Sequence, residues 1–131
     1  MRTNPLKLPK ALASKGSDLE IHLLDIPSCC PVSKNPRPGS VIAIIYRPQA
    51  NVLEVGALAA YIHQYKGGLK DEHGAIVVRD MEGMVSRIAQ DCANAAQTTV
   101  AVLAYLHIVP RQRMFLMTEK IPERVEREAL A

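Results

Sequence analysis

The chain has 131 residues, of which 48% are hydrophobic and 22% are charged, and its formal net charge is +3. This length fits one domain with an aliphatic core, since the chain has no Trp and only one Phe. No apolar run approaches the roughly 18 residues that a membrane span needs, and residues 1–16 carry cations without an apolar stretch of signal-peptide type. We therefore expect a cytoplasmic protein without a membrane partner, whose mild positive charge permits an anionic partner but does not require one.

The first predicted elements are an arm and two strands. Residues 1–17 are polar and show no hydrophobic period, so we interpret them as an N-terminal arm without regular structure and residues 18–131 as a single domain. Apolar and polar side chains alternate over Leu19–Ile26, which predicts a strand. The β-branched run Val41–Tyr46 predicts a second strand, paired antiparallel with the first.

Two helices are predicted next. In Glu54–Lys66, apolar residues recur at helical spacing and form one face, and Gly67-Gly68 supplies a stop; the residues of this face are Val55, Leu58, Ile62 and Tyr65. A longer helix is predicted over Ala75–Ala96, with Gly83 weakening its middle by about 1 kcal/mol relative to Ala. One face of this second helix would be apolar and carry Val77, Met81, Met84, Val85, Ile88 and Cys92.

The C-terminal part predicts a β-hairpin. Its strands are Thr98–Val109 and Arg113–Thr118, and the alternating charges of Glu119–Ala131 are typical of a solvated helix or a tail. The order strand, strand, helix, helix, strand, strand predicts an α+β fold, with two helices on one face of a four-stranded antiparallel sheet. Such a sheet has two open edges, which favour pairing between subunits and hence a homo-oligomer.

A loop between the first two strands holds two of the three cysteines. The three do not have the spacing of a disulfide framework, which favours a reducing compartment. Cys30 precedes Pro31, and Lys34 and Arg37 follow; nearby cations favour the reactive thiolate. The alternative is that Cys30 is a small buried hydrophobe at a strand end.

Three carboxylates are candidates for a binding site. Glu54 begins the first helix, and Asp71 and Glu72 lie between the glycine pair and the second helix. Capping of a helix start is the simpler role, but these carboxylates could also reach one pocket, where a Glu accepts two N–H bonds from a purine-like edge. There is no Cys-x-x-Cys, His-x-x-x-His or phosphate-loop motif, so a zinc site could form only by tertiary assembly, and we predict no metal.

Several short motifs, in this order, resemble the QueF family, which processes the nitrile of 7-cyano-7-deazaguanine. Cys30–Ser33 is similar to the Cys-Pro nucleophile motif of the family. Tyr46–Pro48 and Leu53–Val55 resemble its strand end and the start of its substrate-binding helix, and Tyr61–Lys66 followed by Glu72 resembles the link to its pocket glutamate. The similarity spans roughly residues 20–119.

The resemblance implies a tunnelling fold, in which small α+β subunits join edge to edge into a barrel with pockets between subunits. It also implies that the Cys30 thiolate adds to the nitrile carbon and forms a covalent thioimide. Glu72 would anchor the deazaguanine ring, with Glu54 near it. The substrate-binding residues implied in this way are Leu53, Glu54, Val55, Asp71 and Glu72.

Two departures from the family pattern bear on the reaction. The reductases have an Asp seven residues after the nucleophile, where this chain has Arg37, so proton delivery would fall to Asp71, Glu72 or water. The reductases also have two lysines in the motif associated with NADPH, and Glu54–Ala59 contains none. The chain therefore looks more like the QueF-like amidinotransferases, in which ammonia attacks the thioimide to give the formamidine of archaeosine on tRNA, with no cofactor.

Three functions remain open at this point. The first is ammonia-dependent amidine formation through Cys30. The second is NADPH-dependent reduction of the nitrile, and the third is non-catalytic binding of a deazapurine or a nucleic acid. The base could be free, in tRNA or in DNA.

Overall fold

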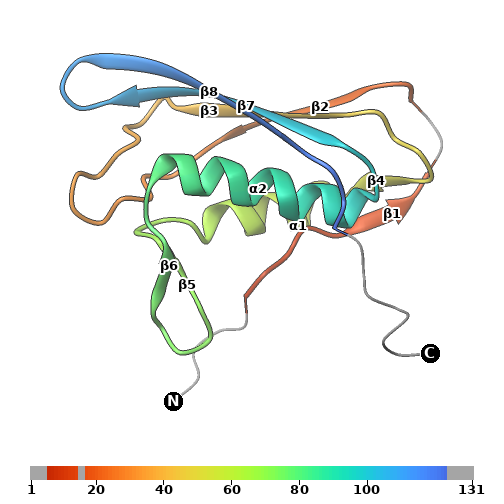
Figure 1. Ribbon diagram of the computed structural model, residues 1–131, viewed down its shortest axis with the longest axis horizontal. Helices are drawn as coiled ribbons and strands as arrows, with labels where there is room; N and C mark the ends of the chain where they lie inside the picture. Colours follow the sequence, from red (N-terminus) through yellow and green to blue (C-terminus); the bar gives the residue numbers. More distant parts are fainter. Residues whose placement is uncertain (1–5, 15–16, 124–131) are drawn as a thin grey trace.

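The computed structural model describes residues 6–14 and 17–123. Two helices cover one face of a four-stranded antiparallel sheet (Figure 1). The α+β class and the four-stranded sheet predicted from the sequence are confirmed. The sheet has the order β2-β3-β7-β8, and its strands are β2 (Glu20–Asp25), β3 (Val41–Tyr46), β7 (Val100–Ile108) and β8 (Gln112–Lys120).

The helices connect the two halves of the sheet. Helix α1 (Val55–His63) and helix α2 (Met81–Ala96) lie between β3 and β7 in the chain, and β3 pairs antiparallel with β7. β2 pairs with β3 as predicted, and β7 and β8 form the predicted hairpin. β2 and β8 each pair with one neighbour among the described strands and are therefore the edges of the sheet.

Four short strands were not predicted. β1 (Ala11–Ala13) pairs with β4 (Asn51–Leu53), and β5 (Leu69–Lys70) pairs with β6 (Ile76–Val78). The expectation that the arm lacks regular structure is wrong for Ala11–Ala13. A three-residue strand is too short to show a period, and its partner lies far along the chain.

The second helix begins later than predicted. Residues 75–80 are not helical, because the β-branched run Ile76–Val78 pairs with β5 instead. Asp80 is the N-cap, and its side chain accepts a hydrogen bond of 2.6 Å from the Gly83 N–H. Val77 is accordingly exposed on β6 rather than part of the apolar helix face.

The core lies between the helices and the inner face of the sheet. It contains alternate residues of β3 and β7 together with most, but not all, of the apolar face predicted for each helix. Helix α2 contributes Met84, Val85, Ile88 and Cys92, all buried. In α1 the buried residues are Leu58, Tyr61 and Ile62, whereas Val55 is 70% exposed, although the sequence placed it on the apolar face.

Apolar side chains are exposed on the outer face of the sheet. Leu23, Phe115 and Met117 are 75%, 65% and 69% exposed.

Within the described ranges, no helix is long and apolar enough to span a membrane. Glu119 and Lys120 belong to β8, and the rest of the predicted C-terminal tail from residue 124 lies outside the described residues.

Candidate functional site

The loop between β2 and β3 forms a tight turn at the two cysteines. The N–H groups of Cys29 and Cys30 both donate to the backbone oxygen of Asn35 at 3.0 Å, and the Lys34 N–H donates to the Cys30 oxygen at 3.0 Å. These bonds close the turn at both ends, so the Cys30 side chain projects from a fixed backbone.

The Cys30 thiol is partly exposed and its pKa is lowered. The main cause is a hydrogen bond with the Ser33 side chain, followed by backbone N–H groups, including that of Ser33, which lies 3.3 Å from Sγ. Hydrogen bonds to the thiolate favour the ionised form. The sequence predicted an activated Cys30 but attributed it to Lys34 and Arg37; the structure assigns the effect to the turn itself.

The other two cysteines differ from Cys30 in both burial and thiol pKa. Cys29 and Cys92 are fully buried, and burial raises the pKa of the Cys29 thiol to about 11 and that of Cys92 to about 12. All three cysteines are free thiols. Cys30 is therefore the nucleophile candidate among them.

Gly67 and Gly68 bring the cysteine turn against the β5–β6 hairpin. The Gly67 N–H donates to the Ser28 oxygen at 2.9 Å. Gly68 has φ +103°, and a Cβ there would lie 2.9 Å from the Ile76 side chain and 3.6 Å from the Cys29 oxygen. The sequence identified this pair only as a helix stop; the close packing of the two glycines also holds the turn that carries Cys30.

The predicted carboxylates occupy two separate places. Glu54 is the N-cap of α1, where its carboxylate accepts from the N–H groups of Ala57 and Gly56, and these bonds, that of Ala57 first, lower its pKa. The two residues beside Glu54 differ in solvent exposure: Leu53 is buried and Val55 is exposed. Capping, the simpler role expected for Glu54, is what the structure has.

Asp71 and Glu72 lie in the turn between β5 and β6, not at a helix start, which corrects the sequence interpretation. Asp71 accepts from the N–H groups of Ala75 at 3.0 Å and His73 at 2.8 Å, and these bonds, that of Ala75 first, lower its pKa. A Glu72 oxygen lies 3.5 Å from His73 Nε2, and both side chains are more than half exposed. The hairpin therefore presents Glu72 to solvent.

A single chain does not bring Glu54 and Cys30 together. The cysteine turn contacts Gly67, beyond the C-terminal end of α1, whereas Glu54 caps its N-terminal end (Figure 1). A helix of 9 residues is about 13 Å long. One pocket containing both groups would need contributions from two subunits.

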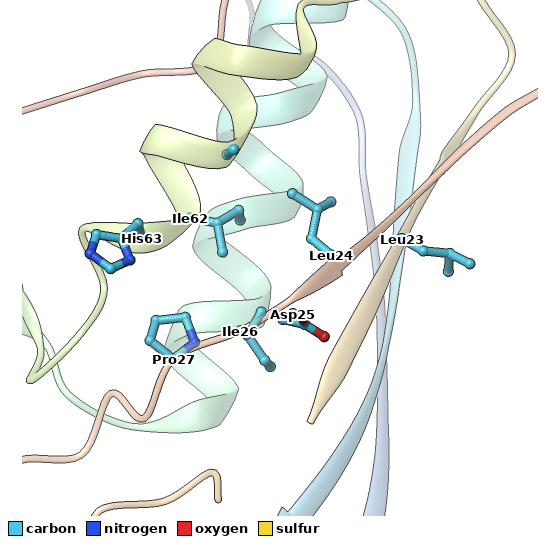
Figure 2. A pocket seen from close by; sticks show the side chains of 8 residues that line it. Leu23, Leu24, Asp25, Ile26, Pro27, Ile62 and His63 are labelled. Atoms are coloured by element: carbon cyan, nitrogen blue, oxygen red, sulfur yellow. The ribbon is translucent and has the colours of Figure 1, made fainter. Parts of the chain in front are cut away.

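A groove of about 440 Å³ lies between the β2 edge and α1 (Figure 2). In Figure 2, Leu24 and Ile62 lie between the strand and the helix, and Leu23 points the other way. Pro27 lines the groove and leads into the cysteine turn three residues later. The volume of the groove is that of a small-molecule site, and the polar side chains that line it are Asp25 and His63.

No described set of three His, Cys, Asp or Glu side chains is grouped so that it could hold a metal ion.

No family model matches the sequence, and the comparison with curated proteins gives no match. The resemblance to the QueF family therefore depends on the motifs and the element order alone.

Proposed function

We propose that the chain attacks the nitrile of 7-cyano-7-deazaguanine with Cys30 and converts the resulting thioimide into an amidine with ammonia. The observation that carries this proposal is the contrast among the thiols. Cys30 is partly exposed and its pKa is lowered by the turn that holds it, while Cys29 and Cys92 are buried with raised pKa values.

The reaction balances without an oxidant or a reductant. The Cys30 sulfur forms a bond to the nitrile carbon, and the nitrile nitrogen takes up a proton to give the thioimide. Ammonia then adds to the same carbon, and the carbon–sulfur bond breaks as the amidine forms. The thiolate leaves and is regenerated, so the sum is addition of ammonia to the nitrile.

The proposed assembly is a tunnelling-fold oligomer with the site between subunits. Its support is that β2 and β8 are open edges among the described strands and that the outer face of the sheet is apolar and exposed. Glu54 from one subunit and Cys30 from another would then share a pocket. A capping carboxylate retains acceptor capacity beyond its two N–H bonds, so Glu54 can also accept from a base.

The position of Glu72 is compatible with a role in holding the base. The β5–β6 hairpin presents this side chain to solvent, beside the elements that position Cys30. In the proposal its carboxylate accepts N–H bonds from the deazaguanine ring. Leu53 and Val55 flank Glu54, and Asp71 fixes the turn that carries Glu72.

The test begins with intact mass spectrometry after incubation with the free nitrile base. We expect an added mass equal to that of the ligand in the wild type and in Cys92→Ala, and none in Cys30→Ala. Amidine product on addition of ammonium would support the full reaction. NADPH oxidation on addition of the nitrile would instead assign a reductase, and an adduct that persists in Cys30→Ala would overturn the proposal.

A further inference from the structure

A second cavity, of about 660 Å³, lies between the end of the Cys30 loop and the β7–β8 hairpin. Its charged side chains are those of Arg37, Arg111 and Arg113, and no Asp or Glu lines it. His107 and Gln112 complete its polar groups. We call this cavity the arginine pocket.

The three arginines are exposed and have no carboxylate partner in the part of the chain that the structure describes. Arg87 shows the contrast, since its guanidinium lies 3.2 Å from Asp91. Like charges that converge on one cavity repel each other, and a bound anion removes that repulsion. Guanidinium groups bind phosphate oxygens through paired N–H bonds.

The two walls of the arginine pocket are fixed to each other by hydrogen bonds. The Arg37 N–H donates to the His107 oxygen at 2.7 Å. The Ser40 hydroxyl, which is buried, donates to the Arg37 oxygen at 2.7 Å and accepts from the His107 N–H at 2.9 Å. The backbone that carries Arg37 is therefore held in place before any ligand binds.

Asn35 connects the arginine pocket to the nucleophile. Its side-chain oxygen accepts from the Val109 N–H at 2.9 Å, and its backbone oxygen accepts from Cys29 and Cys30. One residue thus holds both the hairpin wall of the pocket and the turn that presents the thiol. A ligand bound by the pocket would be held at a fixed position relative to Cys30.

We infer that the arginine pocket binds phosphate groups of a nucleic-acid strand. Three guanidinium groups spread over a loop and a hairpin suit several consecutive phosphates better than one. Resting on the proposed function, this assigns the natural substrate as a nitrile base within a polynucleotide, and the free base presents the same nitrile to Cys30 without the phosphate contacts. It also gives Arg37 a role in binding the strand, where the reductases have a proton donor.

The test measures binding of a fluorescein-labelled single-stranded RNA of 12 nucleotides, and of the matching DNA, by anisotropy. The perturbation is Arg37→Gln, Arg111→Gln and Arg113→Gln together in the full chain. Each phosphate contact on a single strand contributes a slope of about 0.7 to log K against log salt. Removing three contacts should reduce the slope by about 2, and wild-type affinity should then fall about 20-fold more than that of the variant between 50 and 200 mM salt.

A matched control removes the same charge elsewhere, as Arg47→Gln, Lys66→Gln and Arg79→Gln. We expect it to keep the wild-type slope. Equal losses in the two triple variants, or a wild-type slope in the arginine-pocket variant, would overturn the inference. Binding of inorganic phosphate without binding of either oligonucleotide would assign the pocket to free phosphate and overturn it too.

The two proposals fail separately. Adduct formation by the wild type with the free base decides the role of Cys30 and involves no polynucleotide. Oligonucleotide binding decides the role of the arginine pocket and needs no thiol chemistry, so it can be repeated in Cys30→Ala.

Discussion

The hydroxyl of Tyr46 joins three strands, and its removal is the most informative test of the fold that positions the site. The hydroxyl donates to Glu20 Oε1 on β2 at 2.7 Å and accepts from the Leu53 N–H on β4 at 2.7 Å. Tyr46 is only 2% exposed and Leu53 is 3% exposed. Since Glu54 follows Leu53, these bonds also fix the residue that caps α1.

The substitution Tyr46→Phe keeps the ring and deletes both bonds, together with the weaker 3.5 Å contact between the hydroxyl and His22 Nε2. It leaves the buried Leu53 N–H without its partner, which should lower the free energy of unfolding by about 1–3 kcal/mol. The measurement is urea denaturation at equal protomer concentration, because the proposed association would contribute to apparent stability. Tyr105→Phe is the control, since its hydroxyl makes no hydrogen bond with a described residue; its effect should stay within about 0.5 kcal/mol.

The pH dependence gives this prediction its sign. The Tyr46 hydroxyl is the main cause that lowers the pKa of Glu20 below its ordinary value of 4.5. A carboxyl group with a lowered pKa stabilises the fold above its unfolded pKa, and that contribution is lost as the pH falls through the folded pKa. The difference between wild type and Tyr46→Phe should therefore shrink from pH 7 to pH 3.5. A constant difference, or equal effects of the two Phe variants, would refute the reasoning.

Three further predictions concern the nucleophile, the second helix and the assembly. We expect iodoacetamide to modify Cys30 before the other cysteines in the folded protein. The pH at which the rate of Cys30 alkylation is half-maximal should be lower in the folded protein than in urea. Peptide mapping that finds Cys29 equally reactive would contradict this. Gly83→Ala should not give the gain of about 1 kcal/mol expected from helix propensity, because the new Cβ would lie 2.8 Å from Asp80 Oδ1. Urea denaturation should recover that gain in an Asp80→Ala background, and a gain in the wild-type background would refute the clash. Leu23→Lys, on the exposed outer face, should reduce the molar mass measured by light scattering; an unchanged mass would count against assembly through this face.

The main strands could be predicted because each has a local signal. The β-branched run Val41–Tyr46 has the same bounds in the structure, and the alternation over Leu19–Ile26 differs from β2 by one residue at each end. The short strands could not be predicted, since two or three residues carry no period and depend on partners elsewhere. For the same reason residues 76–78 were assigned to a helix, although they pair with Leu69 and Lys70.

The site was predictable in part. Adjacent prolines and cations indicated Cys30, but the hydrogen bonds of Ser33 that lower its pKa arise only when the turn closes on Asn35. The arginine pocket had no signal in the sequence. Arg37 lies against the β7–β8 hairpin because β3 pairs with β7. Both helices separate these two strands in the chain, so the contact is tertiary and has no local signal.

The most direct test of the central claim is the intact mass of the protein after incubation with 7-cyano-7-deazaguanine. The proposal predicts one covalent adduct per chain, located on Cys30 by peptide mapping and absent in Cys30→Ala. A wild-type mass without any adduct, under conditions in which iodoacetamide still modifies Cys30, would contradict it.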